Sequence, residues 1–231
     1  MNTLTVSGVA QVLNILHKEA EVIGQDHIAA NIGQINVEDN NLVHTSPRWL
    51  ADEETISQTI YQDYSLNLST ISQVYGRFLY MIARNCWAKR IVEFGTSTGI
   101  STIYFAAALR DNGGGQLISS ELEPANAART RTNIEAAGLA DLVEIREGDT
   151  INTLRDVGSD VDILLLNGAC PLYLPVLRFV EPFMNRGAAI MGRNAFDPAY
   201  LDYVRDPLNG YFSQPLEIDN GCASEFAIRT L

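Results

Sequence analysis

The chain has 231 residues, 46% of them hydrophobic, which is enough for one sizeable core and too little for two ordinary domains with linkers. Its formal net charge is -12, from 28 acidic and 16 basic residues. A negative field of this kind repels phosphate backbones and anionic lipid surfaces. The composition therefore argues against nucleic acid and membranes as partners and favours a small-molecule substrate.

The three cysteines, Cys86, Cys170 and Cys222, indicate a reducing compartment, because they are few, odd in number and without metal-ligand spacing. The N-terminus lacks the basic and apolar regions of a signal peptide. No apolar run approaches the roughly 20 residues that a membrane-spanning helix needs. We therefore expect a soluble, cytoplasmic protein.

Residues 1–70 are expected to form an N-terminal helical segment that acts as a cap or in oligomerisation, with residues 71–231 as the main domain. An amphipathic helix is predicted at the start, where apolar residues recur at helical spacing: Val6, Val9, Leu13, Leu16, Ala20 and Ile23. Residues 26–50 look irregular. A second helix is predicted over 71–88, with one apolar stripe, Val74, Phe78, Met81 and Ile82. This stripe is expected in the core or at a dimer face, and a homodimer is plausible.

From residue 90 onward, short apolar runs alternate with helical segments. Strands are predicted at 90–94, 116–120, 143–146, 161–166 and 188–191, and helices at 100–109, 125–137 and 173–183. Such alternation is typical of βαβ units and a parallel sheet. Two more strands are predicted at 212–217 and 223–229, around the hairpin-type turn Asp219-Asn220-Gly221. We expect a parallel sheet that is closed by an antiparallel hairpin.

A glycine-containing loop follows the first predicted strand, in the sequence Glu93-Phe94-Gly95-Thr96-Ser97-Thr98-Gly99. Ligands of open parallel sheets bind at the carboxyl ends of the strands. Gly95 allows a tight turn, and Gly99 lets the next helix pack close with its free N–H groups facing a ligand. The middle glycine of dinucleotide enzymes and the lysine of a P-loop are both missing, which disfavours a pyrophosphate or triphosphate.

Acidic residues stand at the ends of three successive predicted strands. Glu93 suits a cationic amino-acid group, and Glu121 lies about 26 residues past Gly95, where an acid bonds a ribose diol. Asp149 could accept a hydrogen bond from an adenine amino group. Glu121 or Asp149 alone is more often a helix cap or a solvated loop residue. An amino acid, a ribose and an adenine together describe S-adenosylmethionine, which we predict as the cofactor.

Several segments resemble the bacterial branch of the catechol-O-methyltransferase-like O-methyltransferases: residues 91–97, 110–115, 121–124, 140–149, 173–177 and 200–207. The resemblance covers roughly two thirds of the chain. It implies the Rossmann-like α/β fold of class I methyltransferases. That fold has a seven-stranded sheet, parallel apart from a C-terminal antiparallel hairpin, with helices on both faces, here with an N-terminal helical extension.

The resemblance also implies which residues bind S-adenosylmethionine. The methionine end would be lined by Glu93, Gly95, Ser97 and Ser101, and the same loops add Thr96, Gly99, Leu122 and Asn167. Glu121 would hold the ribose, and the adenine would meet Gly148, Asp149 and Thr150. Ile71 and Ser72 fall where the family brings the start of an upstream helix over the cofactor.

The metal site of the family is altered. The family carries an aspartate after the fourth strand, a lysine three residues later, and an Asp-Asn pair after the fifth strand, and these acids bind a magnesium-type cation through oxygen. Here Asn167 replaces the first aspartate, Cys170 the lysine and Arg193 the second aspartate, and only Asn194 is retained. We therefore expect no metal. The competing interpretation is a metal site rebuilt from other acids such as Asp197.

Two functions remain open at this stage. One is metal-independent O-methylation of a small molecule in biosynthesis, with Arg193, Asn167 and Asn194 at the reacting end and Arg193 holding an anionic or carbonyl oxygen. Tyr173 and His44 are candidate bases, and Cys170 is either a packing residue or a site thiol. The alternative is a protein that binds the cofactor but catalyses a cyclisation or rearrangement, or only binds.

Overall fold

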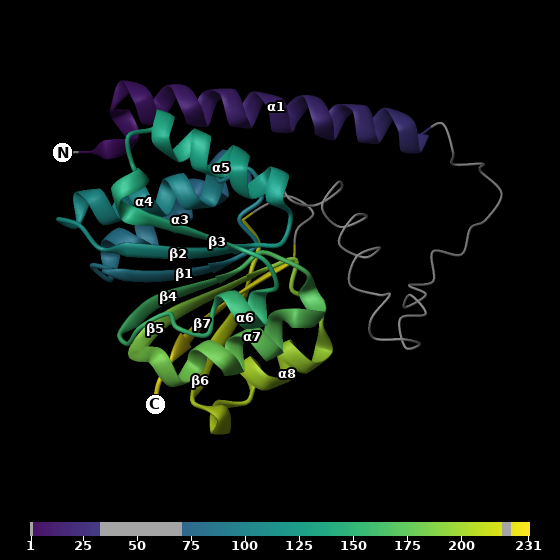
Figure 1. The fold of residues 1–231 in the computed structure, drawn as a ribbon. Helices are drawn as coiled ribbons and strands as arrows, with labels where there is room; N and C mark the ends of the chain where they lie inside the picture. Colours follow the sequence, from purple (N-terminus) through teal and green to yellow (C-terminus); the bar gives the residue numbers. More distant parts are fainter. Residues whose placement is uncertain (1, 33–70, 219–222) are drawn as a thin grey trace.

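The computed structural model describes residues 2–32, 71–218 and 223–231. Its seven-stranded sheet has the order β3-β2-β1-β4-β5-β7-β6, and β7 runs antiparallel to both of its neighbours (Figure 1). The strands are β1 Arg90–Phe94, β2 Gln116–Glu121, β3 Val143–Glu147, β4 Val161–Leu166, β5 Met184–Arg193, β6 Tyr211–Leu216 and β7 Ser224–Arg229. This confirms the predicted parallel sheet with its C-terminal hairpin.

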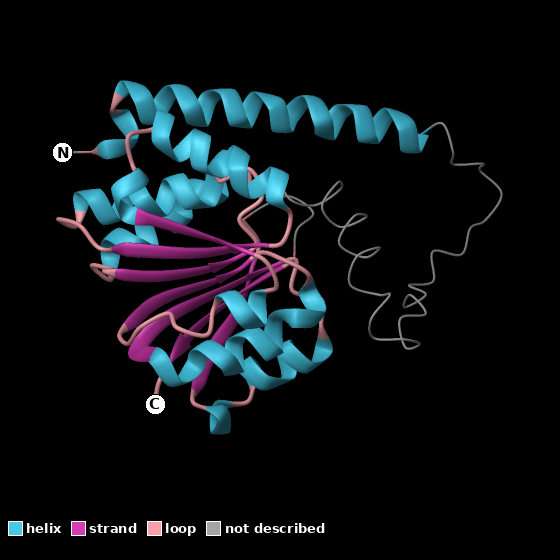
Figure 2. Cartoon of the chain, viewed as in Figure 1, coloured by secondary structure: helices cyan, strands magenta, loops and turns pink. Residues whose placement is uncertain are grey.

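Helices cover both faces of the sheet (Figure 2). One face carries α3 Gln73–Asn85, α4 Ile100–Asp111 and α5 Pro124–Ala136, with α1 Ser7–Ile32 packed on the outside of α4 and α5, and the other face carries α6 Thr150–Thr153, α7 Tyr173–Val180 and α8 Pro198–Arg205. Short 3-10 turns are η1 Thr3–Thr5, η2 Ala140–Leu142, η3 Cys170–Leu172, η4 Glu181–Phe183 and η5 Pro207–Asn209. No helix in these described ranges is long and apolar enough to cross a membrane.

The central strands are apolar on both sides, as expected for a sheet between two helix layers. In β1, Ile91 joins the core beneath α4, while Val92 and Phe94 join the core beneath α7. The buried face of α1 (Val9, Leu13, Leu16) belongs to the same core as α3 and α4. The first helix is therefore packed against the main domain.

The element boundaries differ from the prediction where a local contact or proline intervenes. The helix that begins at Tyr173 ends at Val180 and tightens into η4, because Pro182 lacks the backbone N–H that would continue it. The prediction of irregular structure from residue 26 is wrong over 26–32, which continue α1. Helices α6 and α8 were not predicted, and the Asp219-Asn220-Gly221 turn lies outside the described residues.

Only half of the apolar stripe predicted on α3 packs against the core. Phe78 and Ile82 are partly buried against it, whereas Val74 and Met81 are 60% and 58% exposed. The helix buries the adjacent face instead: Tyr75, Gly76, Leu79 and Ala83. Gly76 explains this rotation, because a Cβ there would lie 2.1 Å from Cε2 of Tyr104, so only a glycine lets α3 approach that ring of α4. Val6 is likewise exposed, at the cap between η1 and α1.

A buried histidine joins α1 to α4. His17 Nε2 lies 3.2 Å from the hydroxyl of Tyr104 on α4. Burial lowers the pKa of His17 below its ordinary 6.5, Arg77 lowers it further and Glu21 opposes the shift. Because the folded state favours neutral His17, its contribution is complete above pH 6.5 and is lost as the pH falls through the lowered pKa.

When the pH is lowered from 7.5 to 5.5, we expect the melting temperature of the wild type to fall several degrees further than that of His17→Gln. The glutamine side chain cannot be protonated in this range. Thermal melts followed by circular dichroism at both pH values measure the difference. An equal fall in the two proteins would show that His17 does not couple α1 to pH.

Candidate active site at the carboxyl edge of the sheet

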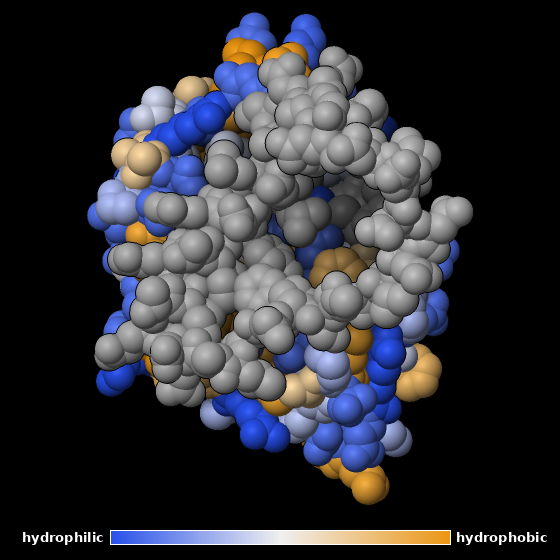
Figure 3. Space-filling model, turned by 90° about the vertical axis from the view of Figure 1, so that its right-hand side faces the viewer, coloured by the Kyte–Doolittle hydropathy of each residue, from blue (hydrophilic) through white to orange (hydrophobic). Residues whose placement is uncertain are grey.

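The strand register brings the predicted site residues into one row. Phe94 at the end of β1 pairs with Ser120 of β2 and Leu166 of β4, and Leu166 in turn pairs with Gly192 of β5. Glu121 pairs with Glu147 at the end of β3. The residues that follow these ends therefore lie side by side along the carboxyl edge, in the order Gly148, Glu121, Gly95, Asn167 and Arg193. Figure 3 views the molecule from this side, where both hydrophilic and hydrophobic described residues reach the surface.

The loop after β1 requires glycine at both predicted positions. Gly95 and Gly99 have φ angles of 90° and 87°, in the left-handed region that side chains disfavour. A Cβ on Gly95 would lie 2.7 Å from the backbone oxygen of Asn167 and 2.7 Å from the nitrogen of Gly168, and one on Gly99 would lie 2.8 Å from Cγ2 of Thr130. The loop therefore passes too close to β4 and α5 for any side chain.

Two polar residues of α5 fix the carbonyl groups of this loop. Thr130 Oγ1 donates to the carbonyl oxygen of Ser97 at 2.7 Å, and Asn133 Nδ2 donates to that of Thr98 at 3.0 Å. Ser97 itself has a left-handed φ of 53°. Thr130 and Asn133 were not predicted as site residues from the sequence. Their spacing of three on one helix face was the available signal.

The carboxylate of Glu121 joins the end of β2 to the glycine loop. Its Oε2 accepts the N–H of Ser97 at 2.7 Å, and its Oε1 accepts the N–H of Glu123 at 3.0 Å. The residue is 5% exposed. Burial raises the pKa of Glu121, and the N–H bonds to its carboxylate lower it. A carboxylate is thus held at the loop with a fixed orientation and has further lone pairs for a ligand.

Glu93 lies beneath the loop on the α4 side and is fully buried. Its Oε2 accepts hydrogen bonds from the hydroxyls of Thr102 at 2.6 Å and Ser119 at 2.7 Å. Its Oε1 is buried and has no hydrogen-bond partner within the described part of the chain. Burial raises the pKa of Glu93, and the nearby hydroxyls of Ser101, Thr102 and Ser119 lower it. These contacts make Glu93 a support of the loop and leave one polar atom without compensation.

The predicted adenine end begins where β3 stops. The N–H of Gly148, at a φ of 125°, donates to the carbonyl oxygen of Glu121 at 2.8 Å. Asp149 caps α6, its Oδ1 accepting the N–H of Asn152 at 3.2 Å. Thr150 is buried. Asp149 therefore does cap a helix, and this cap fixes its place next to Glu121 along the edge.

The other predicted cofactor residues surround the loop. Thr96 and Ser101 are buried and Leu122 is half-buried. Ser72 caps α3, since its Oγ accepts a backbone N–H of the first turn at 3.1 Å, and Ile71 beside it is buried in the core. Ile71 and Ser72 thus stand at the start of α3, and their place over the cofactor stays a prediction.

The ends of β4 and β5 carry the altered positions. Asn167 Nδ2 reaches the carbonyl oxygen of Gly95 at 3.4 Å. Arg193 is 3% exposed at the end of β5, and Asn194 follows it with a left-handed φ of 52°. Oδ1 of Asn194 is buried and has no hydrogen-bond partner among the residues that the structure describes. A buried guanidinium next to two amides does not fit a hard divalent cation, which needs carboxylate oxygens.

Tyr173, one of the two predicted candidate bases, lies in the core. The residue is 1% exposed, and its ring packs edge-on against Phe94 and Tyr200, with centroids 6.2 Å and 5.6 Å away. Its hydroxyl donates to the carbonyl oxygen of Arg193. Burial raises the pKa of Tyr173 well above its ordinary value. The residue holds the end of β5 in place. The other candidate base, His44, lies outside the described residues.

Cys170 occupies the position of the family lysine and is a packing residue. Its Sγ accepts the N–H groups of Phe196 at 3.2 Å and Asp197 at 3.1 Å, which ties the loop after β4 to the start of α8. Burial raises the pKa of its thiol. Asp197 caps α8, accepting the N–H of Tyr200 at 3.0 Å. Across residues 2–32, 71–218 and 223–231, no three His, Cys, Asp or Glu residues gather as a metal site would require.

Comparison with known proteins agrees with this geometry. The family model described as a methyltransferase domain matches residues 92–194. Catechol O-methyltransferase of Niastella koreensis is 34% identical over 58% of this chain and 62% of its own length, so the matched region spans about three fifths of that relative.

Two solved structures share the fold. A putative O-methyltransferase from Klebsiella pneumoniae has a TM-score of 0.65 at 22% identity, over 79% of this chain and 93% of its own. An O-methyltransferase from Bacillus cereus, solved with S-adenosylhomocysteine (SAH), has a TM-score of 0.64 at 20% identity, over 78% and 93%. Residues 92–194 thus match a methyltransferase domain, and the chain shares the class I methyltransferase fold of these solved structures.

Proposed function

We propose that the chain is an S-adenosylmethionine-dependent methyltransferase that acts on an oxygen atom of a small molecule. The observation that carries this proposal is the carboxylate of Glu121, which is buried, fixed by two N–H groups and one strand away from Gly95. The relative that is named a catechol O-methyltransferase supports the choice of oxygen. No feature of the described residues favours the alternative of a cyclisation or rearrangement.

The residues along the carboxyl edge fit this cofactor. Glu121 would accept hydrogen bonds from the ribose hydroxyls, and Gly148, Asp149 and Thr150 would border the adenine. The glycine loop would receive the methionine end, where a cationic group would compensate the Glu93 oxygen that has no partner among the described residues. When bound, S-adenosylmethionine supplies a methyl group on a positively charged sulfur. The residues of the chain bind and orient it, and orientation of the acceptor oxygen provides most of the rate.

Methyl transfer is proposed to be metal-independent. Arg193 would hold an anionic or carbonyl oxygen of the acceptor where the family places its cation, with Asn167 and Asn194 beside it. Next to these residues the surface is hollowed between α8 and the β6–β7 hairpin, where Ala195, Phe196 and Ser224 contribute to the lining. This hollow offers space for an acceptor with an apolar body. An acceptor of low pKa needs little help from a base.

The function is tested by incubating the protein with methyl-labelled cofactor and a panel of phenols and carboxylic acids. We expect label in a product, at a rate that EDTA changes by less than about twofold, since the described residues at this site include no carboxylate pair for a cation. Magnesium-saturated EDTA serves as the control for ionic effects. Turnover without label transfer would support the alternative reaction. Loss of activity in EDTA that magnesium restores would refute metal independence.

The homodimer, a cytoplasmic location and the role of residues 1–70 as a cap stay predictions. The homodimer is supported by apolar side chains exposed on the two N-terminal helices, Ile15 and Val22 on α1 and Val74 and Met81 on α3. Light scattering should give twice the chain mass of 25.4 kDa. A value of one chain mass would exclude the dimer.

A further inference from the structure

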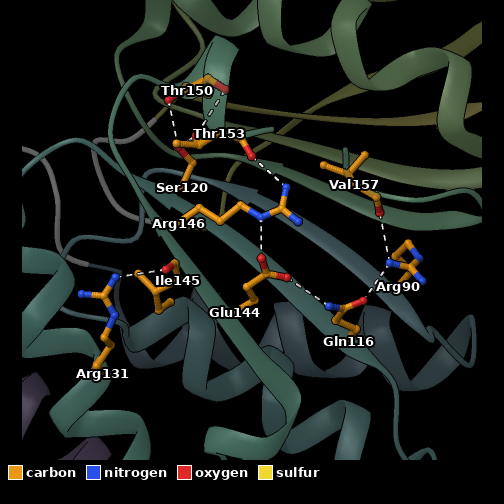
Figure 4. A network of polar contacts seen from close by, with 10 residues as sticks. All are labelled: Arg90, Gln116, Ser120, Arg131, Glu144, Ile145, Arg146, Thr150, Thr153 and Val157. Carbon is orange, nitrogen blue, oxygen red and sulfur yellow. Dashed lines mark hydrogen bonds and ion pairs between the residues drawn. The ribbon is translucent and has the colours of Figure 1, made fainter. Parts of the chain in front are cut away.

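Arg146 connects β3 to the short helix at the predicted adenine end (Figure 4). Its NH1 donates to the carbonyl oxygen of Thr153, the last residue of α6, at 2.8 Å, and its Nε donates to Oε1 of Glu144 at 2.7 Å. The side chain is 22% exposed. The guanidinium therefore holds the far end of the helix whose cap is Asp149.

Helix α6 depends on such contacts because it is a single turn of four residues. Ser120 Oγ lies 2.7 Å from Oγ1 of Thr153 and 3.2 Å from Oγ1 of Thr150, so the hydroxyls fix one side of the turn to β2. Arg146 is the charged anchor at the carbonyl end. Together these contacts set where the cap residue stands.

The guanidinium of Arg146 is itself held in place by a chain of polar contacts across the sheet. Glu144 Oε2 accepts from Nε2 of Gln116 at 3.1 Å, and Oε1 of Gln116 accepts from NH1 of Arg90 at 2.9 Å. Arg90 also donates to the carbonyl oxygen of Val157 at 3.1 Å. Figure 4 shows these groups pointing toward one another in sequence. These contacts disfavour a rotation of the Arg146 side chain that would break its hydrogen bond to Thr153.

We propose that Arg146 is a positioning residue for recognition of the purine, acting through α6 on Asp149. The proposal rests on the proposed function, because it requires the adenine to lie against residues 148–150. Without Arg146 the carbonyl end of α6 loses its charged donor, and the Asp149 carboxylate is no longer held at one distance from the purine amino group. The part of the cofactor affinity that depends on the purine amino group is then lost, while the contacts to the methionine end of the cofactor remain.

The experiment compares two ligands in titration calorimetry: SAH and S-inosylhomocysteine, in which oxygen replaces the purine amino group. The wild type is expected to prefer the adenine ligand. In Arg146→Met the affinity for SAH should fall roughly tenfold, the equivalent of one hydrogen bond. The affinity for the inosyl ligand should change by less than twofold, so the preference largely disappears. Arg146→Lys, which can still donate to Thr153, should recover most of it.

Arg131→Met is the matched control. Arg131 makes the same kinds of bond, to the carbonyl oxygen of Ile145 at 3.1 Å and to Glu147 at 3.3 Å, but it comes from α5 on the opposite face of β3 (Figure 4). It should leave the preference unchanged. Thr153→Val removes the hydroxyl bond to Ser120 without a change in charge, and it should reduce the preference for SAH over the inosyl ligand. This variant tests the role of α6 if Arg146→Met does not fold.

Two results would overturn the role of Arg146. One is an unchanged preference for SAH over the inosyl ligand in a folded Arg146→Met or Thr153→Val protein. The other is a loss of this preference in Arg131→Met that equals the loss in Arg146→Met. Either can occur while the wild type binds SAH normally, and then only this inference is lost. A wild type that binds neither ligand would instead remove the proposed function on which the inference rests.

Discussion

Glu121→Ala is expected to weaken the binding of SAH about 100-fold or more. The substitution removes the acceptor for the ribose hydroxyls and also releases the N–H of Ser97, which the carboxylate holds at 2.7 Å. Hydrogen bonds to a charged group are each worth about 1.5–3 kcal/mol, and about 2.7 kcal/mol corresponds to a factor of 100. Titration calorimetry of the two proteins with SAH measures the effect.

Glu123→Ala is the control for this prediction. Glu123 lies two residues away and is half-buried, but its side chain makes no capping bond to α5. Its removal should change the affinity by less than threefold. If Glu121→Ala stayed within that same threefold range, the carboxylate at the end of β2 would not be a ligand of the cofactor.

Gly95→Ala is expected to destabilise the protein by about 2–6 kcal/mol. A side chain at a φ of 90° costs about 1–3 kcal/mol in backbone strain. Its Cβ would also lie 2.7 Å from backbone atoms of Asn167 and Gly168, which cannot move as a flexible side chain would, and overpacking of this kind adds about 1–3 kcal/mol. For a chain of this size the melting temperature should fall by about 10 °C, with loss of cofactor binding.

Gly114→Ala separates the two causes. Gly114 has a similar φ of 96°, but a Cβ there would meet nothing within 4 Å. It should cost only the conformational part, about 1–3 kcal/mol. Melting curves of both variants give the comparison. Equal losses would mean that the close approach of the loop to β4 carries no energetic weight.

The sheet and the glycine loop could be predicted because their signals are local. The run 90–94 carries apolar residues on both faces, Ile91 on one and Val92 and Phe94 on the other, and the glycines that follow it are the residue type that a tight turn needs. The exact bounds of β1 and β4 follow from this pattern.

The orientation of α3 and the environment of Tyr173 could not be predicted, because both depend on partners distant in sequence. Helix α3 has apolar residues on two faces, and only the close fit of Gly76 against Tyr104 decides which one is buried. Tyr173 carries a hydroxyl that resembles a candidate base in sequence, yet its partner is a backbone carbonyl 20 residues away. The loop after β1 was thus easier to predict from the sequence than the surroundings of the residues after β4 and β5.

The most direct test of the account is a calorimetric titration of the wild-type chain with SAH. We predict saturable binding of one molecule per chain, with a rise in melting temperature, because Glu121, the glycine loop and residues 148–150 form one edge suited to the amino acid, the ribose and the adenine. No heat of binding and an unchanged melting temperature at millimolar ligand would contradict the account.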